Sequence, residues 1–432
     1  MSNVPTSNLP DSPSSQNREF AHDRITKQNF FAFLWHALFL AFVSTFIDVN
    51  TILSSFILKI GGSSTHVGIL SGISIGLPLI TQLLFAGFLA GRPRKKPFLI
   101  LGLYLRVITL AGMGFTLSVS DTVGPAWLML LVFFWLGVFS ISGAFAGISY
   151  TDILGKTLPR SKRGRFLIVK QLIASSGMLI SALIVRRIVI AFPYPHNYTI
   201  LFFVAAGLLF VAGFGFLAIK EDPGKASHIS GTIRTLKAIP RILKADPNLR
   251  NYILAINLMG LSLTIIPFYV VLSKTLFVLT PTMIGNFLLM QFLGMILSTF
   301  LWNAVVRKFR FKGVAISGSL LGGLLPFVVL GLSGFGPAFF QWSFFLAGTL
   351  IAGVRIAYEG ILLEITTNDN RAVYAGISGA LSLTTAVFPI LAGVLINVST
   401  FEAIFSFTSL LVVSSLFFFM RLKCPTPDDV EP

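Results

Sequence analysis

Among the charged side chains inside long apolar stretches of this sequence, four could bind a solute or a proton: Asp48, Arg106, Arg355 and Glu359. Each stretch is long enough to cross a membrane as a helix. A charge in hydrocarbon costs at least about 2.5–3.5 kcal/mol, so such residues usually face a cavity or a partner. Their depth makes these four residues candidates for binding a solute or a proton.

Asp48 is the first candidate for a proton or cation site. Burial disfavours a bare carboxylate, and a carboxyl group that gains and loses a proton can couple that proton to another event. The alternative is structural, namely a carboxylate that pairs with an arginine or caps backbone groups.

Arg355 carries a planar guanidinium that suits bidentate contact with a carboxylate or phosphate. Glu359, one helical turn away on the same face, could instead neutralise it, and so could Asp48 from across a cavity. Arg106 could also contact a solute. Its alternative role is packing, or reaching along the membrane toward the lipid headgroups.

Composition excludes a soluble protein. The 432 residues are 54% hydrophobic and 11% charged, whereas an average soluble domain has about 25% charged residues. We therefore expect an all-α, multi-pass membrane protein. The single cysteine, Cys424, cannot form an internal disulfide, and the five histidines are scattered. These counts predict no metal site, no cofactor and no enzymatic centre.

Twelve segments are apolar and long enough to span a bilayer as helices. They cover residues 30–58, 66–90, 97–118, 126–154, 166–191, 200–219, 252–272, 281–306, 314–332, 337–365, 373–397 and 401–420.

Most of the 33 basic residues fall in the two tails and in every second connection between these segments. Positive charge stays on the cytoplasmic side, so both termini are predicted to be cytoplasmic, in the plasma (cell inner) membrane. This placement explains the net charge of +17 without nucleic acid. We expect a disordered tail over 1–28, a six-helix bundle over 29–219, a cytoplasmic loop over 220–250, a second bundle over 251–420 and a tail over 421–432. The central loop is either a basic amphipathic helix on the membrane surface or a solvated linker.

An internal repeat relates the two halves. At one constant spacing, Tyr358 matches Tyr150, and Ile361, Leu362 and Arg371 match the corresponding residues of the first half, Ile153, Leu154 and Arg163. Agreement in depth, loop length and the arginine favours a duplication of a six-helix unit.

The twelve helices, the basic central loop and the two similar halves resemble the major facilitator superfamily. The segment Gly87-Phe-Leu-Ala-Gly91-Arg92-Pro-Arg94-Lys95-Lys96 is similar to the signature between helices 2 and 3 of that family, with Gly91 where the family usually has Asp. The resemblance implies two pseudo-symmetric six-helix bundles around a central cavity. It also implies that helices 1, 4, 7 and 10 line that cavity.

The resemblance further implies a cytoplasmic gate. In the family, the helix 2–3 arginine pairs with an acid at the end of helix 4, a role that Arg92 and Asp152 would fill here, with an ordinary interfacial ion pair as the alternative. The expected gate contains these two residues and, from the signature and the repeated loops, Gly87, Gly91, Arg94, Arg163, Glu364 and Arg371.

These observations predict a monomeric secondary transporter of a small solute that works by alternating access and is not an enzyme. No phosphate-binding loop is present, so ATP does not power transport within this chain. Transport could be coupled to protons through Asp48 or Glu359, or it could be simple uniport. The alternative functions on the same fold are a lipid scramblase and a membrane sensor that does not transport. Small residues of the eleventh segment, Gly376 and Gly379, are expected to let helices approach closely.

Overall fold

The computed structural model describes residues 15–221, 223, 232–366 and 371–423, which form helices and no β-strand. The elements of the N-terminal half are α1 (Ser15–Phe46), a π-helical turn η1 (Val49–Leu53), α2 (Ser54–Lys59), α3 (Ser64–Ala90), α4 (Lys96–Ser118), the 3-10 turn η2 (Ser120–Thr122), α5 (Pro125–Thr157), α6 (Arg160–Ala191) and α7 (His196–Ala218).

The C-terminal half contains α8 (Thr232–Ala245), α9 (Pro247–Thr264), α10 (Pro267–Leu276), α11 (Pro281–Ser333), α12 (Pro337–Phe340), α13 (Trp342–Glu364), α14 (Arg371–Ala380), α15 (Leu383–Val398) and α16 (Phe401–Met420). Helix α11 covers two predicted spans and is interrupted at Arg310, whose φ of 58° lies in the left-handed region. With this interruption, the described helices account for the twelve predicted membrane spans.

Three predicted spans are interrupted rather than continuous. The first breaks between α1 and η1 at Asp48, the seventh between α9 and α10, and the eleventh between α14 and α15. Apolar composition alone does not show where a helix breaks, because every residue around these points is compatible with a buried segment.

Two predicted boundaries need correction. Helix α1 begins at Ser15, so residues 15–28 are helical and not part of a disordered tail. Midway along this helix, Gln28 donates to the carbonyl oxygen of Ala218 at 2.7 Å and Asn29 to that of Lys220 at 3.0 Å. These bonds satisfy carbonyl groups at the end of α7. The predicted 220–250 loop contains α8, and α9 already begins at Pro247.

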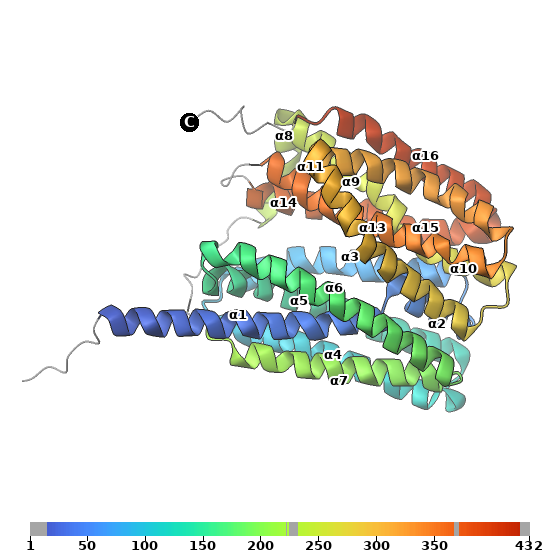
Figure 1. The fold of residues 1–432 in the computed structure, drawn as a ribbon, viewed down its shortest axis with the longest axis horizontal. Helices are drawn as coiled ribbons and strands as arrows, with labels where there is room; N and C mark the ends of the chain where they lie inside the picture. The colour runs from blue at the N-terminus through green and yellow to red at the C-terminus, as the bar shows by residue number, and fades with distance from the viewer. Residues whose placement is uncertain (1–14, 222, 224–231, 367–370, 424–432) are drawn as a thin grey trace, which may run out of the picture.

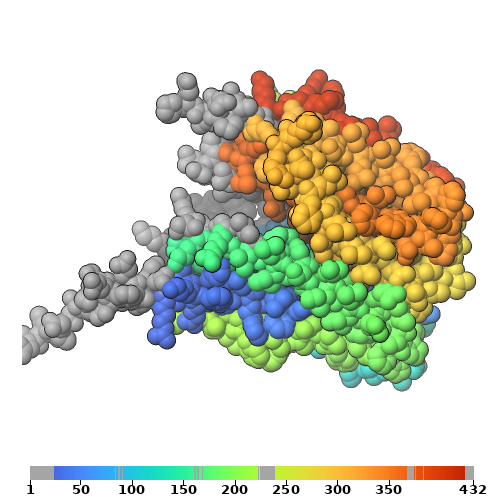
Figure 2. Space-filling model, in the orientation of Figure 1, coloured from blue at the N-terminus to red at the C-terminus, as the bar shows by residue number. Residues whose placement is uncertain are grey.

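The two halves lie side by side and run between the same two ends (Figure 1). We call the end with the start of α1, the α3–α4 and α5–α6 connections and the end of α16 the basic end. The opposite end, with the α2–α3 and α10–α11 connections, is the far end. Figure 2 shows the blue-green and yellow-red halves in direct contact toward the far end.

Matching hydrogen bonds at the basic end support the duplication. Asn29 and the backbone of Lys220 exchange two hydrogen bonds, and so do Asn248 and the backbone of Lys423. The amine of Lys96 donates to two carbonyl oxygens at the end of α7, and that of Lys312 does the same at the end of α16. Each half therefore closes its last helix with the same pair of side-chain types.

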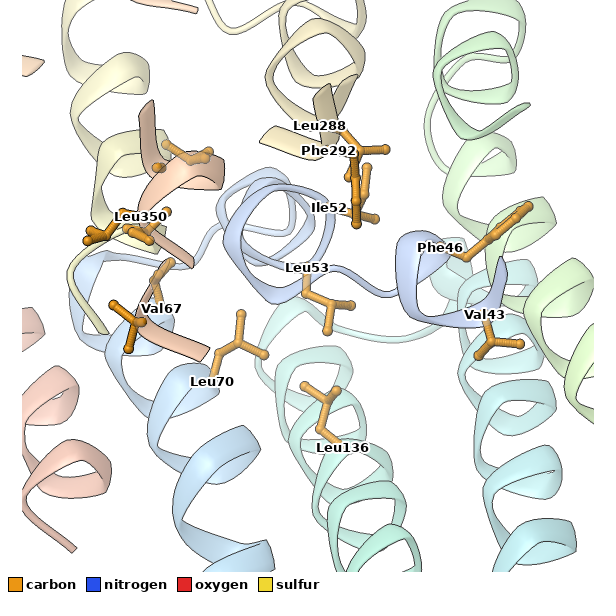
Figure 3. Close-up of a cluster of buried hydrophobic side chains, with 14 of the residues drawn as sticks. Val43, Phe46, Ile52, Leu53, Val67, Leu70, Leu136, Leu288, Phe292 and Leu350 are labelled. Atoms are coloured by element: carbon orange, nitrogen blue, oxygen red, sulfur yellow. The ribbon is translucent and has the colours of Figure 1, made fainter. Parts of the chain in front are cut away.

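An apolar core joins the halves at mid-depth, around η1. Ile52 and Leu53 of η1 are buried, and Leu288 and Phe292 of α11 lie beside them (Figure 3). Because lipid is as apolar as these side chains, their contribution to the contact comes from close packing and not from transfer out of water. Because this core draws on both halves, the break in the first helix is also a point of contact between them.

The main seam between the halves runs along α3 and α15. Three glycines four residues apart on α3, Gly68, Gly72 and Gly76, face α15. A Cβ on Gly68 would lie 2.3 Å from the carbonyl oxygen of Pro389, so only glycine permits this approach. The predicted close-approach positions differ: a Cβ on Gly376 or Gly379 would meet nothing within 4 Å.

We predict that Gly68→Ala weakens the seam, because the added methyl group meets backbone that cannot move aside. Overpacking of this kind costs about 1–3 kcal/mol. Gly207→Ala on α7 is the matched control, since its Cβ would enter open space. In thermal unfolding of the purified protein, Gly68→Ala should melt lower and Gly207→Ala should not. Equal melting temperatures for the two variants would contradict the close contact between α3 and α15 at Gly68.

Candidate functional site

Asp48 stands at the break in the first membrane helix. Its Oδ2 accepts hydrogen bonds from the backbone N–H of Thr51 at 2.9 Å and from the Thr51 hydroxyl at 2.8 Å. Its Oδ1 accepts from Nε2 of Gln291 at 3.0 Å. The carboxylate thus caps η1 and, at the same time, bonds to α11 of the other half.

The local sequence explains why the chain breaks here. An aspartate with extended backbone is a favourable N-cap, and the φ and ψ of Asp48 are −60° and 122°. The Ser54 hydroxyl donates to the carbonyl oxygen of Val49 at 2.6 Å, which satisfies a backbone acceptor inside the turn. An arginine partner for Asp48, one of the alternatives from the sequence, is not among its contacts with described residues.

Arg355 and Glu359 lie on one face of α13, and both side chains are exposed. The described residues include no ion pair between them, so the intrahelical pair expected as an alternative does not form in this structure. Lys170 of α6, in the other half, interacts electrostatically with both, and its amine lies 5.6 Å from the ring centre of Tyr150. Charged side chains of both halves are therefore near enough to interact electrostatically.

Arg106 lies within the N-terminal half. Its guanidinium carbon is 4.1 Å from the ring centre of Phe139, a cation–π distance. Its Nε is buried and has no hydrogen-bond partner. A cavity of about 320 Å³ and another of about 220 Å³ both have Arg106 in their lining. Packing against an aromatic ring was an expected alternative, whereas Arg106 does not point toward the lipid headgroups.

At the basic end, Asp152 does not bind Arg92 as expected. It pairs with Lys95 at 2.8 Å and with Lys156 at 2.5 Å, while Arg92 lies over the rings of Phe88 and Phe98. The reason is the loop geometry. Glu221 accepts the backbone N–H groups of Lys95 and Lys96 at the start of α4, which directs the Lys95 side chain toward α5.

The other gate residues are only partly brought together. Gly91 ends α3, and Arg94 is exposed beside it. Glu364 pairs with Arg310 at 3.0 Å. The carboxylate at the end of α13 therefore pairs with the arginine at the interruption of α11. Three predicted gate residues lie outside the part of the chain whose side chains the structure describes: Gly87, Arg163 and Arg371.

A hydrogen bond links α14 to the start of α9 at the same end. The Tyr374 hydroxyl donates to Oδ2 of Asp246 at 2.5 Å, and Oδ1 of Asp246 accepts from the backbone N–H of Asn248. This hydrogen bond joins the start of α14 to the start of α9.

No group of three metal-ligating side chains occurs among the described residues. The contacts that sequence reasoning missed are those of Gln291, Lys95, Glu221 and Arg310. Each lies far along the chain from its partner or is one of several equivalent basic residues in a cluster.

The fold and these intramembrane charges define a multi-pass membrane protein of two similar six-helix halves. The family model of the Major Facilitator Superfamily matches residues 34–277, and the chain belongs to this superfamily. The family is one of transporters, which supports a secondary transporter. No curated protein matches the chain.

Several solved transporters share the fold. A D-xylose-proton symporter is 14% identical with a TM-score of 0.67, covering 91% of this chain and 97% of its own. A POT family transporter in complex with a thioalcohol-conjugated peptide is 12% identical with a TM-score of 0.66, over 92% and 95%. The nucleoside transporter NupG is 12% identical with a TM-score of 0.63, over 92% and 98%. At these identities the likeness concerns the fold alone.

We predict that Lys95, and not Arg92, is coupled to Asp152. In a double-mutant cycle of Lys95→Met and Asp152→Asn, the coupling measured by thermal unfolding should be about 0.5–1 kcal/mol, since the pair is partly solvated. The matched cycle with Arg92→Met should be additive within about 0.5 kcal/mol. Coupling to Arg92 alone would restore the pair expected from the sequence.

Proposed function

We propose that this chain is a secondary transporter that moves a small solute by alternating access between its two halves. The observation that carries this proposal is the placement of the contacts between the halves. Among the described residues, hydrogen bonds between the halves occur at mid-depth and toward the far end. Arg355 and Glu359, which are exposed on α13, make no hydrogen bond to described residues of the other half and interact with its Lys170 only electrostatically.

The contacts toward the far end include side chains from several helices. Asn397 of α15 bonds to Ser64 and to Thr65 at the start of α3. Lys274 donates to the carbonyl oxygen of Leu58, and Arg186 to Asn286. We infer a state that is closed at the far end and gives solute access from the basic end. With positive charge inside, the basic end is cytoplasmic in this proposal and both termini lie in the cytoplasm.

The solute would meet Lys170, Arg355 and Glu359 between the halves. This set contains two cations and one anion on facing helices, so a solute with a polar or charged group could replace one of their mutual interactions. Charged groups inside a membrane pair with one another, so a group that exchanges one partner for another keeps the pairing it needs. Such a set suits a transporter, which must bind its solute and also let it go.

Proton coupling would use Asp48. Its carboxylate is held by Nε2 of Gln291, whose Oε1 is buried without a partner. After rotation of the amide, this oxygen could accept a hydrogen bond from a protonated Asp48. Gln291 can thus bond to either protonation state while the halves are together. Separation of the halves removes this partner and changes the relative stability of the two states.

The proposed coupling is tested with Asp48→Asn in proteoliposomes, with uptake of a panel of solutes measured with and without a pH gradient. The asparagine mimics a permanently protonated side chain. Accumulation driven by the gradient should fall to the background level, whereas exchange of the same solute across the membrane should persist.

Asp121→Asn is the control for this experiment, because Asp121 is an exposed carboxylate in the far-end turn η2. It should leave both activities unchanged. If a monodisperse Asp48→Asn protein still accumulates solute along the gradient, Asp48 is not the coupling group and Glu359 becomes the candidate. If no solute of the panel enters in any condition, the transport proposal itself fails.

A further inference from the structure

Inside the N-terminal half, two cavities meet at Arg106 and Gly143. The first, of about 320 Å³, lies between η1, α3, α4 and α5. The second, of about 220 Å³, lies between α1, α4, α5 and α6. The described residues that line them all belong to the N-terminal half. Lys170, which also interacts with Arg355 and Glu359 of the other half, lies in the wall of the second cavity.

Arg106 has no counter-ion in this space. No aspartate or glutamate occurs among the described lining residues of either cavity, and the buried Nε has no acceptor. Lys170 lines the second cavity and adds a second positive charge to it. Because an unpaired guanidinium inside a membrane is unfavourable, an anion that enters this space would gain a strong, charge-assisted hydrogen bond.

The remaining walls show what kind of anion fits. The first cavity is lined mainly by apolar side chains, among them Leu110, Met113 and Leu136, with hydroxyl groups from Ser74 and Ser140. Its volume is at the lower end of small-molecule sites. An apolar body that carries one carboxylate would fill the apolar part and place its charge on Arg106.

We propose that this space is a binding site for a small organic monocarboxylate with an apolar body, held by Arg106. The carboxylate binds the guanidinium, and the ring of Phe139 supports the guanidinium from the other side. The role of this ligand as transported solute or as effector rests on the proposed function, but the binding site does not.

Two elements connect this site to the contact between the halves. Ser74, Pro78 and Gln82 of α3 line the first cavity, while Gly68, Gly72 and Gly76 of the same helix face α15. Ile47 and Val49 also line the cavity, and Asp48 between them bonds to Gln291. A change in the contact between the halves would therefore move two walls of the cavity.

The test is calorimetric titration of the purified, full-length protein with acetate, benzoate and 3-phenylpropionate, each compared with its neutral amide. Benzoate and 3-phenylpropionate should bind at least about tenfold more tightly than their amides, because only the carboxylates form charge-assisted bonds. Acetate, which lacks the apolar body, should bind more weakly than both.

Arg106→Gln should remove the preference for the carboxylates, and Arg106→Lys should restore part of it, since the charge remains but the bidentate geometry does not. Arg187→Gln, which removes an exposed arginine of α6, should keep the full preference. The site is refuted if no carboxylate binds more tightly than its amide, or if Arg106→Gln keeps the preference. Neither result depends on transport. The binding site can therefore be refuted while the transport proposal stands, and the transport proposal can be refuted while the binding site stands.

Discussion

The break in the first membrane helix at Asp48 is the constraint on which the rest of the site depends. A helix that stops inside a membrane leaves backbone groups that must be satisfied within the protein. The carboxylate of Asp48 accepts a hydrogen bond from the N–H of Thr51 and another from Nε2 of Gln291, which belongs to the other half. The break therefore requires contact with the C-terminal half, and the apolar core around Ile52 and Leu53 forms at the same place.

Asp48 and Arg106, two intramembrane charges of the N-terminal half, differ in how they are satisfied. Asp48 accepts three hydrogen bonds from described groups, whereas Arg106 has an aromatic ring and no acid. The satisfied charge lies where the halves touch, and the unsatisfied one lies beside a cavity. This difference is why we assign coupling to Asp48 and ligand binding to Arg106.

The spans, the duplication and the depth of the intramembrane charges could be predicted from the sequence, because each depends on local composition. The partners could not. Gln291 is one polar residue in an apolar segment, and only the packing of α11 against η1 brings it to Asp48. Lys95 and Arg92 stand in the same basic cluster, and it is Lys95, whose backbone N–H donates to Glu221, that reaches Asp152. The seam glycines Gly68, Gly72 and Gly76 were not predicted, although their spacing of four is typical of close helix contact, and the predicted Gly376 and Gly379 make no such approach.

The central claim, alternating access between two rigid halves, is tested most directly by distances between spin labels in the Cys424→Ser background. One pair, at Arg94 and Arg421, spans the halves at the basic end, and a second, at Asp121 and Val278, spans them at the far end; all four side chains are exposed. Each pair should show two distances, and conditions that lengthen one should shorten the other. A single, unchanged distance for both pairs in every condition would contradict the account.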